Sequence, residues 1–109
     1  MIEIREYVDQ QGRNFIRQWL DRLDNFAQAR VITHLERLGS GNFSAVKGVG
    51  AGVFEMRLNF GPGYRIYFGK DGEKLVILLA GGTKKRQQKD IETAHALWQE
   101  YKQHNREKK

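Results

Sequence analysis

The fold is decided by the stretch VFEMRLNFGPGYRIYFGKDGEKLVILLAGGTKKRQQKDI, residues 53–91. Apolar and polar residues alternate along its first half, which is the period of a half-buried β-strand. Glycine-containing turn signals stand at residues 61–63 and 71–72, and a lysine-rich segment follows the last apolar run. The stretch therefore predicts an antiparallel meander that carries arginines on one face and ends in a basic turn. Fixed guanidinium groups beside flexible ammonium groups are suited to phosphate.

Side-chain alternation predicts which residues share a face of this sheet. One apolar row contains Phe54, Met56, Leu58, Phe60, Tyr64, Ile66 and Phe68. Matching this row across a three-residue loop at 61–63 places Phe60 opposite Tyr64. Asn59 is then expected to face Arg65, and Arg57 to face Tyr67.

The last apolar run, residues 75–79, is apolar at every position, so polar residues mark neither of its two faces. An Asp71-Gly72 turn of two residues would pair Phe68 with Leu75. This pairing predicts Leu75, Ile77 and Leu79 on the Phe54 face. Val76 and Leu78 would then lie on the Arg65 face, where a ligand, a partner or the last helix must cover them.

Helical periodicity appears on both sides of the meander. Apolar residues recur from Phe15 to Leu23, and again at Val31, Ile32, Leu35 and Leu38 before Gly39. Asn25 and Gln28 have the spacing of a capping box, so we expect a helical hairpin. A further helix is expected from about Gln87, a short strand within residues 2–8, a mobile connection at 39–52 and a frayed basic tail from about 104 to 109.

These elements predict an α+β fold in one domain, residues 1–109: an N-terminal helical hairpin packed on a small antiparallel sheet of three or four strands, with a C-terminal helix. The chain has no cysteine and a formal net charge of +6. Disulfides and thiolate chemistry are thereby excluded, and an anionic partner is favoured. No signal-peptide pattern or membrane-spanning run appears, so we expect a cytoplasmic protein without membrane contact.

Three motifs together resemble the RelE/ParE toxin superfamily, in particular its HigB-like branch of addiction module killer proteins. They are Phe54-Glu55-Met56-Arg57, Gly63-Tyr64-Arg65-Ile66-Tyr67 and Gly81-Gly82-x-Lys84-x-x-Gln87-x-x-Asp90-Ile91. The resemblance covers nearly the whole chain. It implies the toxin of a type II toxin-antitoxin pair, neutralised by a small antitoxin protein, expected to be of the helix-turn-helix type.

The resemblance implies an endoribonuclease that cuts mRNA on the ribosome, as the RelE and HigB branches do. It also leaves open a non-enzymatic inhibitor of DNA gyrase, as in the ParE branch. An RNA-binding module without catalysis is a third interpretation, since related scaffolds support different activities.

In RelE-like enzymes the arginine of the glycine-tyrosine-arginine motif is catalytic, and it corresponds to Arg65 here. By the same resemblance, Lys84 and Arg57 are the other expected catalytic residues. The expected RNA-binding residues are Lys47, Lys85, Arg86, Tyr67 and Asn59. The catalytic tyrosine found further along in RelE has no counterpart in this chain, where Asp90 or Ile91 occupies that region.

RNA cleavage without a metal or cofactor needs an activated 2′-hydroxyl, stabilisation of the phosphate charge and a proton for the leaving oxygen. Arginine suits the second task because its planar fork binds two phosphate oxygens. Glu55 shares the arginine face and has two interpretations, a general base or an ion-pair partner of Arg57. Tyr67 also has two, a platform for base stacking or an aromatic ring packed against the stem of Arg57.

Overall fold

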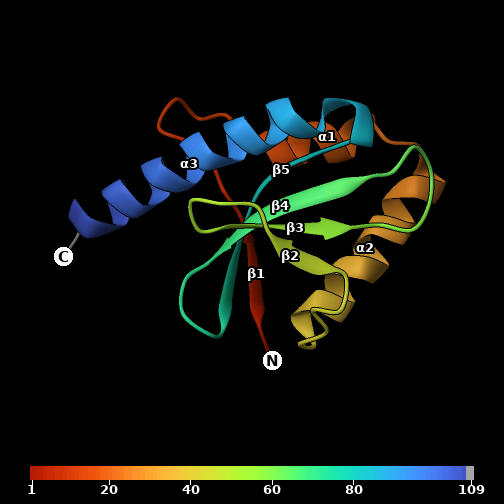
Figure 1. Cartoon of the computed structure of the whole chain (residues 1–109), viewed down its shortest axis with the longest axis horizontal. Helices are drawn as coiled ribbons and strands as arrows, with labels where there is room; N and C mark the ends of the chain where they lie inside the picture. The colour runs from red at the N-terminus through yellow and green to blue at the C-terminus, as the bar shows by residue number, and fades with distance from the viewer. Residues whose placement is uncertain (108–109) are drawn as a thin grey trace.

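The computed structural model describes residues 1–107 and has the expected α+β architecture. A five-stranded sheet with the order β1-β5-β4-β3-β2 separates two layers of helix (Figure 1). The strands are β1 (Glu3–Glu6), β2 (Val46–Gly48), β3 (Val53–Arg57), β4 (Arg65–Lys70) and β5 (Leu75–Gly82). The helices are α1 (Phe15–Arg22), α2 (Asn25–Gly39) and α3 (Gln87–Glu107), with a 3-10 turn, η1 (Lys84–Arg86), directly before α3.

The sheet is mixed and larger than expected. β1 pairs with β5 in the parallel sense, whereas the other pairs are antiparallel. No hairpin sets the direction of β1, because the rest of the sheet and both N-terminal helices separate it from β5 in the chain. The expected mobile connection at 39–52 instead contains β2, which pairs with β3 through a turn at 49–52. Gly50 and Gly52 have φ angles of 92° and 82°, which only glycine adopts easily.

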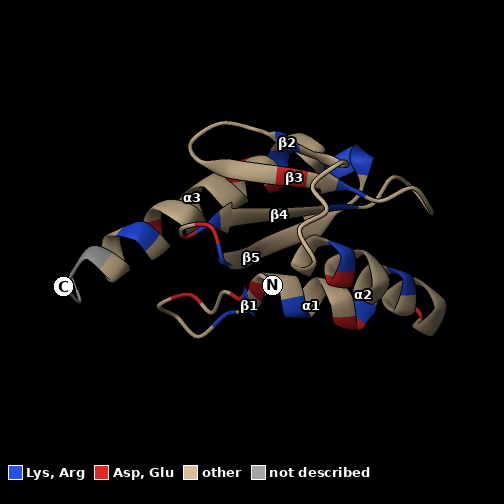
Figure 2. Ribbon diagram, turned by 90° about the horizontal axis from the view of Figure 1, so that it is seen from below, with Lys and Arg blue, Asp and Glu red and all other residues tan. Residues whose placement is uncertain are grey.

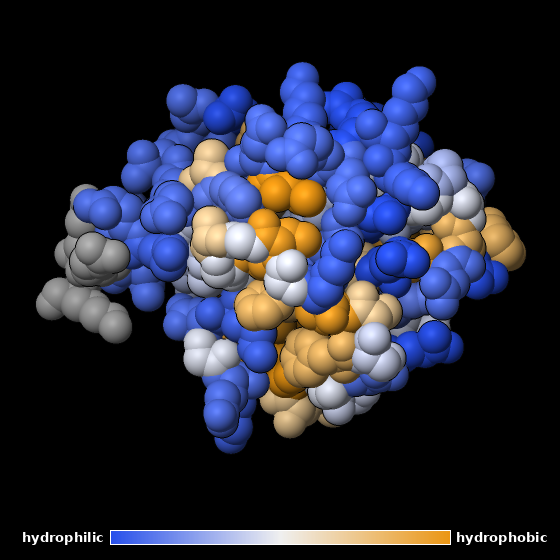
Figure 3. Space-filling view, in the orientation of Figure 1, coloured by the Kyte–Doolittle hydropathy of each residue, from blue (hydrophilic) through white to orange (hydrophobic). Residues whose placement is uncertain are grey.

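Two hydrophobic clusters lie on opposite faces of the sheet. The cluster on the first face joins α1 and α2 to the predicted apolar row of β3 and β4, and this confirms that row. The cluster on the second face joins α3 to Tyr67, Ile77 and Leu79. Figure 3 shows apolar residues from the centre to the lower edge of one side of the molecule, with hydrophilic side chains along the upper edge.

The helix boundaries agree closely with the sequence pattern, with small corrections. Asp24, not Asn25, caps α2, since its side chain accepts a hydrogen bond from the Ala27 amide at 2.8 Å. Ile32 is 54% exposed and does not belong to the buried stripe of α2. α3 begins at Gln87 as expected and is helical through Glu107, so residues 104–107 continue the helix; residues 108–109 of the expected tail lie outside the described residues. Within residues 1–107, none of the helices has the length and apolarity that crossing a bilayer requires.

The pairing of β4 with β5 differs from the expectation. Phe68 pairs with Leu78, and the connection is a wider turn closed by a hydrogen bond from the Asp71 amide to the Leu75 carbonyl at 2.9 Å. A bulge follows between Tyr67 and Phe68. Val76 and Leu78 therefore face the N-terminal helices, whereas Ile77 and Leu79 face α3, the reverse of the prediction. The run was ambiguous because both of its faces are buried and apolar.

The pairing of β3 with β4 is also shifted, and this shift shapes the functional face. Arg57 lies directly opposite Arg65, and the connection between the strands spans residues 58–64. Gly61 has a φ angle of 64°, and a Cβ there would lie 2.6 Å from the Tyr64 ring. The wider loop replaces the expected loop of three residues, but the shift is by two residues, so each side chain keeps its predicted face.

Each tryptophan ring lies on a strand glycine. A Cβ on Gly69 would be 2.4 Å from the Trp98 ring, and a Cβ on Gly81 would be 2.3 Å from the Trp19 ring. We expect Gly69→Ala to lower the free energy of unfolding by about 1–3 kcal/mol, because the added methyl group overpacks the contact between β4 and α3. Urea unfolding followed by tryptophan fluorescence measures this loss.

Gly48 supplies the matched control for Gly69, because a Cβ at this strand position would meet nothing within 4 Å. Gly48→Ala is expected to change stability by less than about 0.5 kcal/mol. Equal unfolding midpoints for the two variants would contradict the packing of Trp98 on Gly69.

Candidate functional site

Several of the expected site residues lie where β3 ends, β4 begins and β5 leads into η1. The register places Arg57 directly opposite Arg65, so both side chains stand on one face of the sheet. Figure 2 shows the basic segments of β2, β3, β4 and η1 near one another, around the acidic segment of β3. Residues that are far apart in the sequence are thus brought to one end of the sheet.

Arg65 is the buried centre of this group, with only 6% of its surface exposed. Its Nη1 donates a hydrogen bond to the Gly63 carbonyl at 2.6 Å. Its Nε lies 3.6 Å from Oε2 of Glu55 and has no hydrogen-bond partner among the described residues. A Cβ on Gly63 would lie 3.1 Å from Nη1 of Arg65 and 3.2 Å from Cβ of Lys84. Gly63 therefore packs closely against both the guanidinium of Arg65 and the start of η1.

Glu55 is the counter-ion of the site and is 1% exposed. Oε2 of Glu55 accepts a hydrogen bond from Nε2 of Gln87 at 2.8 Å, and Oε1 lies 3.8 Å from Nζ of Lys47. Its cationic neighbours are therefore Arg65 and Lys47, and not Arg57 as one interpretation of the sequence had it. Because a buried carboxylate is costly unless it is paired, these contacts also hold the end of β3 to β2, β4 and α3.

A cavity of about 450 Å³ opens beside Glu55. Its lining includes three residues expected from the sequence, Lys47, Arg57 and Asn59. All three are exposed, whereas the carboxylate of Glu55 is buried at the floor. The cavity thus presents cations and an amide to solvent, with a carboxylate beneath them, an arrangement that can receive an anion and exchange a proton with it.

Tyr67 lies in the core and not at the surface. Its side chain is 0% exposed and packs in the cluster between the sheet and α3. Burial, reinforced by the nearby Glu55, raises the pKa of its hydroxyl well above the ordinary value. The expected base-stacking role of Tyr67 is therefore wrong, because no base can reach the ring. It pairs across the strands with Glu55, so the expected packing against Arg57 is also incorrect.

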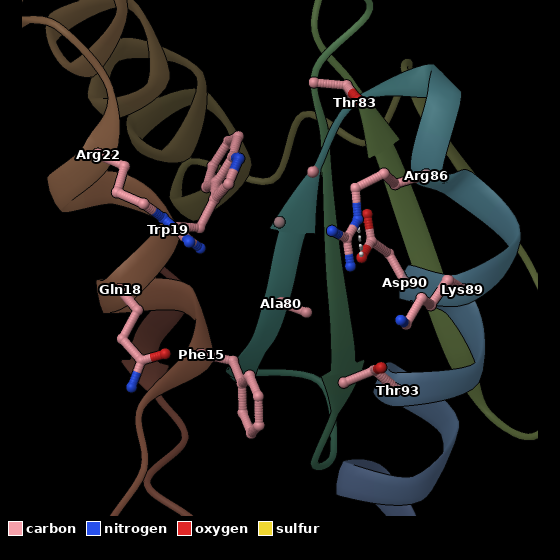
Figure 4. A pocket seen from close by; sticks show the side chains of 12 residues that line it. Phe15, Gln18, Trp19, Arg22, Ala80, Thr83, Arg86, Lys89, Asp90 and Thr93 are labelled. Atoms are coloured by element: carbon pink, nitrogen blue, oxygen red, sulfur yellow. Dashed lines mark ion pairs between the residues drawn. The ribbon is translucent and has the colours of Figure 1, made fainter.

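The basic turn divides between two sites. Lys84 is exposed and belongs to the surroundings of Arg65, and Lys85 is exposed on the same turn. Arg86 instead lines a separate cleft of about 480 Å³ between α1 and α3, where its Nε lies 3.9 Å from Oδ1 of Asp90. Figure 4 shows Arg86, Lys89 and Asp90 on one side of this cleft, facing side chains of α1. Arg86 is not part of the cavity beside Glu55.

Asp90 is the second buried carboxyl group near the site, at 8% exposure. Burial raises its pKa, an effect that the neighbouring Arg86 and Lys89 oppose. A Cβ on Gly82 would lie only 1.9 Å from Oδ2 of Asp90, so this carboxyl group packs against bare backbone. At Asp90 the start of α3 consequently packs closely against the end of β5.

Gln87 is a site residue that the charge pattern did not reveal. The signal was its fixed place in the motif Gly81-Gly82-x-Lys84-x-x-Gln87, three residues after Lys84, where the first turn of α3 directs it toward β3. Among residues 1–107, no group of three or more His, Asp or Glu side chains is arranged to bind a metal ion.

Comparison with known proteins gives one family and one curated relative. Residues 18–99 match the family described as phage derived protein Gp49-like (DUF891). A protein of Haemophilus influenzae, described as an uncharacterized protein, is 46% identical over 83 residues, which cover 75% of this chain and 84% of that relative. The matched family region contains α2, the meander, η1 and the site around Arg65.

Proposed function

The chain belongs to the Gp49-like family of phage-derived proteins, and from this membership and the geometry around Arg65 we propose that it is the toxin of a type II toxin-antitoxin pair that cleaves mRNA on the ribosome. One observation carries the proposal. The buried carboxylate of Glu55, whose Oε2 lies 3.6 Å from Nε of Arg65, lines a cavity whose lining also includes Lys47 and Arg57. The resemblance to RelE-like and HigB-like toxins supplies the substrate.

The exposed cations bind the RNA backbone first. Lys47 and Arg57 line the cavity, and Lys84 lies beside the Gly63 loop. The scissile phosphate then replaces the Gly63 carbonyl as the acceptor of the Arg65 Nη1 hydrogen bond. A charged acceptor makes the stronger bond, so this exchange compensates for moving the loop. Arg65 stabilises the charge of the pentacoordinate phosphate, which is where such a donor contributes most.

Glu55 and Lys84 are assigned the proton transfers. The 2′-oxygen attacks the phosphorus, and its proton passes to the carboxylate of Glu55. The bond from phosphorus to the 5′-oxygen then breaks, and that oxygen takes a proton from the ammonium group of Lys84. The products are a 2′,3′-cyclic phosphate on one fragment and a 5′-hydroxyl on the other. General acid-base catalysis of this kind contributes about 10²- to 10⁴-fold to a rate.

The partners follow from the same proposal. The ribosome and its mRNA are the target, and the net charge of +6 favours their approach through long-range attraction. The cognate antitoxin neutralises the protein by covering the basic end of the sheet or by displacing α3. A small antitoxin of the helix-turn-helix type fits the resemblance, and the protein acts in the cytoplasm.

The second candidate function is RNA binding without cleavage, and one observation favours it. Arg65 and Glu55 are both almost fully buried, and a protein that only binds RNA needs neither group exposed. Such a protein would show salt-dependent RNA binding and no cleavage in any condition.

The proposal is tested by mapping mRNA 5′-ends in cells after the protein is induced. We expect new ends at fixed positions within codons, arising before any response to DNA damage, because cleavage on the ribosome follows the reading frame. The same strain expressing an Arg65→Lys variant serves as the control. An early DNA damage response without new mRNA ends would favour gyrase inhibition, and growth arrest without either would contradict both activities.

A further inference from the structure

The cavity beside Glu55 does not end at Asn59. A smaller cavity of about 100 Å³ lies beside it and shares Ser44, Ala45, Arg57 and Asn59 with the first. Its other lining residues are His34 and Arg37 of α2, Asn42 of the following loop, and Met56. The two cavities are therefore adjacent, and together they are called the groove, which extends from Lys47 past Arg57 to the C-terminal half of α2.

The groove is lined by cations and amides. Arg37 is an exposed cation in the last turn of α2. The Asn42 side-chain oxygen accepts a hydrogen bond from the Ser44 amide at 3.0 Å, which orients this side chain. Among the lining residues of both cavities the only carboxylate is Glu55, which is buried and already paired. A polyanion meets no exposed negative charge along this path.

The His34 ring is held in place at the far end of the groove. Its Nδ1 donates to the Arg30 carbonyl at 2.7 Å, and its ring centroid lies 5.9 Å from that of Phe60, at an interplanar angle of 33°. The Arg30 guanidinium lies over the Phe60 ring, with its Cζ atom 4.7 Å from the ring centre. A fixed aromatic ring beside a phosphate-binding arginine is the arrangement with which proteins bind the bases of single strands.

We propose that this groove is the path of single-stranded RNA on one side of the scissile phosphate. The strand crosses Arg57 and Asn59, Arg37 binds the next phosphate, and His34 and Asn42 contact the adjoining base. Single-stranded RNA is the ligand because the branch at α2, about 100 Å³, is too small for a duplex and takes only part of one unstacked base. The inference rests on the proposed function only in taking RNA as the ligand.

The cleft between α1 and α3 is the competing path. It also contains cations, Arg22, Arg86 and Lys89, but it shares no lining residue with the cavity beside Glu55. The groove toward α2 is favoured because it is continuous with the candidate site.

The experiment measures binding of a short single-stranded oligoribonucleotide in which every 2′-hydroxyl is methylated. Methylation removes the nucleophile, so the measurement is independent of cleavage. Fluorescence anisotropy at several salt concentrations compares Arg37→Ala with Arg22→Ala. These two are matched, because each replaces an exposed arginine in the last turn of an N-terminal helix. Arg37→Ala is expected to weaken binding about 3- to 10-fold and to reduce the salt slope by about 0.7, the loss of one phosphate contact. Arg22→Ala is expected to bind like the wild type.

Each outcome is decisive for the groove. A loss with Arg22→Ala alone would overturn the proposal in favour of the cleft between α1 and α3, and equal effects of both variants, or no binding by the wild type, would also overturn it. Binding that depends on Arg37 in a protein that never cleaves mRNA would support the groove while the proposed nuclease fails. If the wild type cleaves mRNA and Arg37→Ala changes neither RNA binding nor cleavage, the proposed groove is wrong and the proposed nuclease is unaffected.

Discussion

Arg65→Lys is expected to reduce mRNA cleavage by about 10²- to 10³-fold while the domain stays folded. The loss corresponds to removing one preorganised donor from the charge-stabilising site of an enzyme. Lysine keeps the positive charge beside Glu55 but lacks the planar fork that can bind phosphate and retain the ion pair together. The measurement is the initial cleavage rate of mRNA on programmed ribosomes, with thermal unfolding of the same preparation as the check on folding.

The choice of lysine matters because Arg65 is buried against Glu55. Arg65→Ala would leave the carboxylate without this partner, at a cost of about 3–5 kcal/mol, and lost activity could then reflect lost structure. Arg57→Lys is the matched control, since Arg57 lies directly opposite Arg65 but is exposed. It is expected to retain most of the activity. Full activity of a folded Arg65→Lys protein would rule out the assigned role of Arg65.

Glu55→Gln should have the second large effect, a decrease in cleavage rate of about 10²- to 10⁴-fold, because it removes the group that accepts the 2′-hydroxyl proton. Glutamine has the same shape and can still accept the hydrogen bond from Gln87, so this contact is preserved. The measurement is the initial cleavage rate of mRNA on programmed ribosomes.

A structural role for Glu55 would give a different result. If Glu55 only neutralises Arg65 and Lys47, the variant would have a lower unfolding temperature and weaker RNA binding, and its cleavage rate would fall no further than its binding. Binding of the methylated oligoribonucleotide provides the second readout, and it should be retained by Glu55→Gln, since the phosphate-binding cations remain. A folded variant that binds the oligoribonucleotide and cleaves mRNA at the wild-type rate would therefore exclude the assignment of Glu55 as the base.

Much of the fold followed from side-chain parity, and its failures have a common cause. The row from Phe54 to Phe68 was predicted correctly because its opposite face is polar. The faces of Val76 and Ile77 were inverted because both neighbours are apolar, so only the turn length could set the register, and that turn was wider than its Asp-Gly signal suggested. The strand β2 was missed because it is three residues long and lies in the glycine-rich segment 39–52.

The candidate site was predictable to a similar depth. Alternation alone placed Arg57 and Arg65 on one face, and the shift of register by two residues left that result intact. Alternation did not predict the burial of Glu55 and Tyr67. A row that contains polar residues is expected to face solvent, whereas α3 covers part of this row. Tyr67 and Glu55 lie beneath α3 and the basic turn for this reason, and the hydrogen bond from Gln87 shows how the helix closes over them.

The chemistry of the cut ends tests the central claim most directly. Purified protein is incubated with ribosomes programmed with a defined mRNA, and the termini of the fragments are identified. Attack by the 2′-oxygen predicts a 2′,3′-cyclic phosphate on the upstream fragment and a 5′-hydroxyl on the downstream one, and Arg65→Lys should form both about 10²- to 10³-fold more slowly. Fragments that carry 5′-phosphates, or intact mRNA in the presence of the folded wild-type protein, would contradict the assignment of Arg65 and Glu55 as a ribonuclease centre.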